Sequence, residues 1–153
     1  MRTLSDADRA AVLGFAHQQI GKPYGGPLSG TTIGRFGDGW DCSSLVSAAY
    51  AQVGVALTPF TDDIANETET IDPLLAQPGD LILYRYEDPT QPGVVYPHVG
   101  LWLDSSSMLD ASFSHGGVGE HPILQYPCEI RRPGPERRAH QQPVGEEYQP
   151  PQM

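Results

Sequence analysis

The hydrophobic pattern of this chain changes once, at Pro78-Gly79-Asp80, and this change limits the folds that it can adopt. Before that point, apolar residues recur at helical spacing. After it, short β-rich runs alternate with turn residues. Helices that come first and strands that come later indicate an α+β fold with an antiparallel sheet. The 153 residues suffice for one such domain with its own core.

Capping residues and periodicity predict the individual elements. Ser5 and Asp41 are suitable N-caps for the first two helices. The expected helices are residues 6–20, 42–53 and 61–67, and the expected strands are 81–86, 99–103, 108–111 and 129–132. A turn at residues 104–107 should join two of these strands as a hairpin. Residues 1–133 are therefore the expected domain, and the Pro-, Gln- and Glu-rich residues 134–153 are an expected disordered tail.

Charge and cysteine content exclude several classes of function. Acidic residues outnumber basic ones 19 to 9, which gives a formal net charge of −10. Nucleic acid and anionic membrane surfaces are therefore not expected partners. The first ten residues have no apolar segment typical of a secretory signal peptide. The two cysteines show no zinc-ligand spacing, so no metal is expected, and Cys128 is expected to be a small core residue.

Cys42 is the most informative residue, because it falls in the first turn of a predicted helix. Free N–H groups and the partial positive charge of a helix N-terminus stabilise a thiolate, which is the reactive form of cysteine. Position alone leaves two interpretations open. Cys42 is either a catalytic nucleophile or a small buried side chain on the helix.

His98 and Asp110 are the candidates for the other parts of a catalytic site. His98 opens a predicted strand and can serve as general base for a thiol. Asp110 lies twelve residues later, across the predicted hairpin, where a carboxylate can orient the imidazole. The alternatives are an ordinary structural histidine and an aspartate that faces water. His115 and His121 lie in a Gly- and Pro-rich stretch and are not expected to take part.

Four motifs, in this order, resemble those of the NlpC/P60 cysteine peptidases. They are Gly21-Lys22-Pro23-Tyr24-Gly25-Gly26, Trp40-Asp41-Cys42-Ser43-Ser44-Leu45-Val46, Gln77-Pro78-Gly79-Asp80-Leu81 and His98-Val99-Gly100-Leu101-Trp102-Leu103. The similarity covers about residues 8–133. It implies a papain-like α+β fold and a thiol protease that needs no cofactor. The implied substrate is the stem peptide of bacterial peptidoglycan, cut next to D-γ-glutamyl and the diamino acid.

The resemblance also implies a role for particular residues. Cys42 is the implied nucleophile, His98 the base, and Asp110 the third polar residue, a position often held by histidine in the family. The implied substrate-binding and oxyanion residues are Tyr24, Asp41 and Ser43. Ser44 departs from the family, where a glycine usually follows Cys-Ser. The Tyr24-Gly25-Gly26 spacing is tight and the loop before Cys42 is long. The resemblance therefore does not identify the bond that is cut.

Other functions share this set of residues. A papain-like amidase, an acyltransferase or a deamidating toxin would use the same nucleophile on another acyl substrate, because a fold does not fix its chemistry. A non-catalytic module that binds wall peptides is a further alternative. A wall hydrolase of this kind would be secreted, carried by a phage or delivered into a target cell. Because the net charge is acidic, delivery of the protein to an anionic wall by a partner is one alternative, and an immunity protein that restrains it is another.

Overall fold

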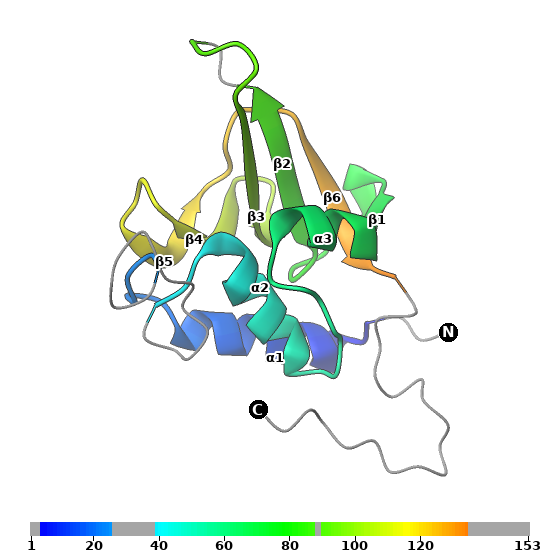
Figure 1. Ribbon diagram of the computed structural model, residues 1–153. Helices are drawn as coiled ribbons and strands as arrows, with labels where there is room; N and C mark the ends of the chain where they lie inside the picture. The colour runs from blue at the N-terminus through cyan, green and yellow to red at the C-terminus, as the bar shows by residue number, and fades with distance from the viewer. Residues whose placement is uncertain (1–3, 26–38, 88–89, 135–153) are drawn as a thin grey trace.

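A computed structural model describes residues 4–25, 39–87 and 90–134, and it has the expected α+β architecture (Figure 1). The helices are α1 (Asp6–Gln18), α2 (Cys42–Ala51), α3 (Thr61–Glu67) and the short 3₁₀ helix η1 (Pro73–Leu75). The strands are β1 (Thr68–Ile71), β2 (Leu81–Glu87), β3 (Val95–Asp104), β4 (Ser107–Ser112), β5 (Gly117–Pro122) and β6 (Cys128–Pro133). They form one antiparallel sheet in the order β1-β6-β2-β3-β4-β5.

The two long helices begin where their capping residues predict. Ser5 Oγ accepts a hydrogen bond from the Asp8 N–H at 3.0 Å, and the Asp8 carboxylate accepts one from the Ser5 N–H. Asp41 and Ser44 form the same reciprocal pair at the start of α2. Both pairs satisfy N–H groups that have no partner inside the helix. The N-terminus of α2 is therefore held in place at Cys42.

The core lies between the helices and one face of the sheet. In Figure 1, α1 and α2 lie across the lower part of the sheet, with α2 packed on β3 and β4 and α1 packed on α2. Buried residues of α2, such as Leu45 and Tyr50, contact alternate residues of the central strands. The intervening residues face the other side of the sheet and form a smaller cluster: Ile82, Tyr84, Met108 and Ile130. This alternation is the period-2 pattern of a strand buried on both faces.

The two outer strands were not expected from the sequence. β1 has the sequence Thr-Glu-Thr-Ile, and β5 contains two glycines and a proline, so neither shows an alternating apolar pattern. Each lies at an edge of the sheet and pairs with one neighbouring strand. An edge strand buries less of its surface, so it needs fewer apolar residues. β3 also begins at Val95, four residues earlier than expected, which places His98 inside the strand. Of the expected tail, residues 135–153 lie outside the described residues.

None of the helices in the described part of the chain is long and apolar enough to cross a membrane.

The carboxylate of Asp80 joins three distant parts of the fold. It is fully buried and accepts hydrogen bonds from Arg9 of α1 at 2.8 Å, from Arg132 of β6 at 2.8 and 3.1 Å, and from the Gln77 N–H at 2.7 Å. The Tyr50 hydroxyl of α2 donates to the carbonyl of the adjacent Gly79. Asp80 is thus a structural residue that fixes α1, the entry into β2 and the last strand.

Removal of Asp80 should destabilise the domain strongly. Asp80→Ala would leave two arginines without their shared carboxylate, and breaking a buried ion pair in this way costs about 3–5 kcal/mol. Asp72→Ala is a matched control, because the Asp72 carboxylate accepts the Leu74 N–H at the exposed start of η1, and its loss should cost about 1 kcal/mol. Urea unfolding of both variants measures the difference. Equal losses would contradict the role assigned to Asp80.

Candidate active site

Three elements bring Cys42, His98 and Asp110 together. Cys42 is the first residue of α2, His98 lies on β3 and Asp110 on the neighbouring β4. The His98 Nε2–H donates to Asp110 Oδ2 at 2.6 Å, which leaves Nδ1 of the same ring for the hydrogen bond with Cys42. The Asp110 side chain is 1 % exposed and that of His98 is 17 % exposed. The arrangement is a chain of thiol, imidazole and carboxylate at the wall of a cleft.

Gly100 allows Asp110 to lie this close to His98. A Cβ atom at Gly100 would be 3.0 Å from the Asp110 Cβ and 3.3 Å from the Met108 sulfur. A side chain at this position would therefore push β3 and β4 apart or turn Asp110 away. This is a packing reason for the glycine in the motif His98-Val99-Gly100.

The hydrogen-bond partners of His98 keep its imidazole charged. Burial alone would lower the pKa of His98, but the hydrogen bonds with Asp110 and Cys42, and the charges of both, outweigh it and raise that pKa from 6.5 to about 10. At neutral pH the ring is therefore an imidazolium beside the sulfur of Cys42. A cation and a helix N-terminus beside a sulfur are the surroundings typical of reactive cysteines.

Tyr24 is a second neighbour of Cys42 and receives a hydrogen bond from its backbone N–H. A parallel bridge with Trp40 holds it there, through hydrogen bonds from the Gly25 N–H to the Trp40 carbonyl and from the Trp40 N–H to the Pro23 carbonyl. Burial, together with the charges of Cys42 and Asp41, raises the pKa of Tyr24 to about 12. The phenol therefore stays protonated and can donate a hydrogen bond.

The cleft has a volume of about 420 Å³, and its lining includes Tyr24, Cys42, His98, Asp110, Phe113 and His115. The ring of Phe113 is 72 % exposed at its rim and packs edge-on against Tyr24, with 5.6 Å between ring centroids. The nucleophile thus faces an open groove with aromatic and polar walls, and an extended peptide can enter such a groove.

Asp41 and Ser43 flank Cys42 in sequence but are not among the described residues that line this cleft, and both make hydrogen bonds within the protein. Asp41 Oδ1 accepts the Ser44 N–H at 2.8 Å as the N-cap of α2. Ser43 Oγ lies 3.0 Å from the Pro59 carbonyl oxygen and 3.5 Å from Asp41 Oδ1. Ser44, which stands where the family usually has glycine, donates to the Asp41 carbonyl and completes the cap. Binding of substrate by Asp41 and Ser43 remains a prediction.

Two histidines that were given no role from the sequence belong to this site. His121 Nδ1 lies 2.5 Å from the second oxygen of Asp110, and the His115 ring stacks on His121 with centroids 4.1 Å apart. Both were missed because β5 was not expected as a strand. The usable signal was the alternation of Gly117, Gly119 and His121, which places His121 on one face with two glycines.

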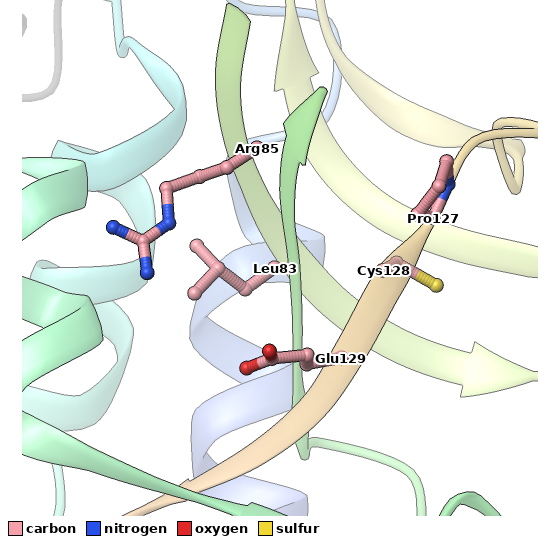
Figure 2. Close-up of a pocket in the computed structure, with 5 residues that line it drawn as sticks. All are labelled: Leu83, Arg85, Pro127, Cys128 and Glu129. Carbon is pink, nitrogen blue, oxygen red and sulfur yellow. The ribbon is translucent and has the colours of Figure 1, made fainter. Parts of the chain in front are cut away.

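Cys128 is exposed, so its expected place in the core was wrong. It lies two strands from His98, with Tyr84 of β2 between them. It opens β6 at the end of the sheet, beyond the buried Ile130. Figure 2 shows its sulfur pointing away from Arg85 and Glu129, which line a second, smaller pocket of about 240 Å³. Both cysteines are free thiols. Cys42 is therefore not held in a disulfide.

Comparisons with known proteins give a consistent result. The model of the NlpC/P60 family matches residues 21–130. Peptidoglycan endopeptidase RipB of Mycobacterium tuberculosis is 38 % identical over 119 residues, which are 73 % of this chain and 46 % of that protein. This chain thus spans about half the length of that curated relative.

Solved structures agree with the sequence comparisons. The structure of the peptidoglycan hydrolase RipB has a TM-score of 0.63 at 35 % identity, covering 82 % of this chain and 64 % of that one. RipD of M. tuberculosis, described as a non-catalytic NlpC/p60 domain protein adapted to peptidoglycan binding, has a TM-score of 0.62 at 25 % identity. The similarity to RipD covers 82 % of this chain and 96 % of RipD.

Replacement of the carboxylate beside His98 should change the titration of this ring. Asp110→Asn keeps the shape but removes the charge that raises the pKa of His98. We expect that pKa to fall from about 10 by about 1–3, so the imidazolium would be lost at lower pH. NMR titration of the His98 ring nitrogens measures this. Asp104→Asn, in the exposed β3–β4 turn, is the control with the same loss of charge. An unchanged titration in Asp110→Asn would contradict the assignment.

The two thiols should differ in reactivity. Burial and the neighbouring Glu129 raise the pKa of Cys128, so this thiol stays protonated at neutral pH. Cys42 lies beside an imidazolium at a helix N-terminus, so we expect iodoacetamide to alkylate it at least about 10-fold faster at pH 7. Peptide mass spectrometry over time measures both rates, with Cys42→Ser as the control. Faster modification of Cys128 would contradict the assignment of Cys42 as the reactive thiol.

Proposed function

The chain belongs to the NlpC/P60 family, and from this we propose that it is a cysteine endopeptidase that hydrolyses amide bonds in bacterial peptidoglycan stem peptides. The single observation that carries the proposal is the convergence of Cys42, His98 and Asp110 at the wall of an open cleft. A module that only binds wall peptides has no need of a thiol paired with a charged imidazole. The resemblance of the motifs to the family supports the D-γ-glutamyl-diamino acid bond as the target.

The proposed reaction proceeds through an acyl-enzyme. The Cys42 thiolate attacks the scissile carbonyl carbon, and the negative charge moves to the carbonyl oxygen. We assign stabilisation of this oxyanion to the backbone N–H of Cys42 and to the protonated hydroxyl of Tyr24, which are hydrogen-bonded to each other before substrate binds. His98 then gives its proton to the leaving amine, and the C–N bond breaks.

Deacylation reverses the roles. His98, now neutral, takes a proton from water, and the resulting hydroxide attacks the thioester carbon. The C–S bond breaks, the new carboxylic acid leaves and gives its proton to solvent, and Cys42 and His98 return to the thiolate and imidazolium. Asp110 holds the His98 ring in one orientation and tautomer through both half-reactions.

Asp41 is the proposed contact for a positively charged group of the substrate. Its carboxylate lies close enough to Cys42 and Tyr24 for its charge to raise the pKa of the Tyr24 phenol. A free amine of a stem peptide would be attracted to the same charge. Ser43, adjacent in sequence, would complete this subsite. The net charge of −10 opposes adsorption to an anionic wall, which favours delivery by a partner or a fused module.

Digestion of purified muropeptides tests the proposal. We expect mass spectrometry to show new stem-peptide fragments with the wild type and none with Cys42→Ala. The fragment masses identify the bond, and a matched pair of stem peptides with a free or acetylated N-terminus tests the subsite at Asp41.

Other outcomes would separate the alternatives. If no muropeptide is cut while Cys42 is still alkylated rapidly, the peptidoglycan assignment is wrong and another acyl substrate must be sought. If stem peptides bind without turnover and Cys42 is inert, the domain is a binding module.

A further inference from the structure

The Asp110 carboxylate has two partners, and only one of them is His98. Oδ2 accepts from His98 at 2.6 Å, while Oδ1 lies 2.5 Å from Nδ1 of His121. The side chains of Asp110 and His121 are 1 % and 13 % exposed, so this second contact is largely removed from water. The catalytic chain proposed above uses His98 and leaves His121 without a function.

An ionised carboxylate can only accept hydrogen bonds, so both rings must donate to it. His121 therefore carries its proton on Nδ1. Without this donor, Oδ1 of Asp110 would be a buried charged atom with no partner, which is costly. A carboxylate held at both oxygens cannot rotate about its Cβ–Cγ bond without losing one of the two contacts.

The strand pairing explains how His121 reaches Asp110. In the register of β4 and β5, Asp110 lies opposite Gly119, and His121 is two residues farther along the same face. A Cβ atom at Gly119 would be 2.9 Å from His121 Nε2 and 3.3 Å from Cε1. The His121 ring thus occupies the space that a side chain of residue 119 would fill, and it folds back across the glycine to Asp110.

One face of the His121 ring is also covered. The His115 ring stacks on it at an angle of 15° between the planes, and Ser112 Oγ lies 3.0 Å from His115 Nδ1. Ser112 and His115 both line the cleft. The ring therefore contacts both Gly119 on β5 and the turn that borders the substrate groove.

We propose that His121 is a positioning residue, which fixes the carboxylate of Asp110 so that its other oxygen points at His98. The inference rests on the proposed function, since it assigns His121 to the same Cys42–His98 chemistry. It predicts that loss of the Nδ1–H donor impairs turnover more than binding, because His121 does not touch the reacting atoms.

Two substitutions distinguish the effect of the His121 hydrogen bond from the effect of the space that its ring fills. His121→Phe keeps a flat ring against His115 but removes the hydrogen bond, whereas His121→Asn can place an amide N–H near the position of Nδ1. On a defined muropeptide, we expect His121→Phe to lower kcat by about 10- to 100-fold with KM within about 2-fold. His121→Asn should recover most of this loss. His17→Asn, at an exposed histidine beside Glu120, is the control and should leave kcat unchanged.

A double-mutant cycle tests the geometry. Gly119 does not need a positive φ, so alanine fits the backbone there. In the wild type, Gly119→Ala should push the His121 ring away from Asp110 and lower kcat nearly as much as His121→Phe. In a His121→Ala background the same change should cost little more, because the displaced ring is gone. Equal effects of Gly119→Ala in both backgrounds would overturn the proposal.

A measurement without substrate keeps this inference separate from the proposed function. We expect the Nε2 proton of His98 to give a slowly exchanging NMR signal in the wild type and in His121→Asn, and to broaden in His121→Phe. If the wild type cuts no muropeptide but this pattern is seen, the proposed function fails and the positioning role stands. If the His98 signal and the kcat are the same in His121→Phe as in the wild type, the positioning role is wrong. A fall in unfolding midpoint with unchanged kcat and His98 signal would show a structural role only and would also overturn it.

Discussion

A carboxylate removed from water needs a donor at each oxygen, and this chain meets that requirement at two places on which the rest depends. Asp80 takes hydrogen bonds from Arg9, Arg132 and a backbone N–H, and so joins α1 to the beginning of β2 and to β6. Asp110 takes them from two histidines on β3 and β5. The first carboxylate fixes the frame, and the second gives the site its electrostatics, because its charge contributes to the raised pKa of His98.

Two glycines, which have no side chain, leave the space in which Asp110 makes its contacts. Gly100 on β3 leaves room for Asp110 itself, and Gly119 on β5 leaves room for the ring of His121. Asp110 thus lies between two strands that each have a glycine next to it. A sheet normally fills such positions with β-branched residues. Here the space is used to bring polar groups within hydrogen-bond distance of one another in a buried place.

Features that depend on local sequence could be predicted, and those that depend on strand pairing could not. Asp41 and Cys42 show the first case, since a cap and a helix N-terminus are set by neighbouring residues. The role of Asp110 could be predicted in part, because a short hairpin places it beside His98. His121 shows the second case. Its role needs β5, whose glycines lower its strand propensity and become meaningful only in register with β4.

The NlpC/P60 fold does not by itself settle whether a member is an enzyme, since a relative of similar structure is described as non-catalytic. In this chain, the groups that bear on the question are His98 and Tyr24 in the cleft. In this chain the carboxylate and the thiol raise the pKa of His98 to about 10, while burial and nearby negative charge raise that of Tyr24 to about 12. The first shift keeps the proton that a leaving amine needs. The second keeps the hydroxyl able to donate a hydrogen bond, so in the reaction proposed above these charges would serve both the leaving amine and the oxyanion.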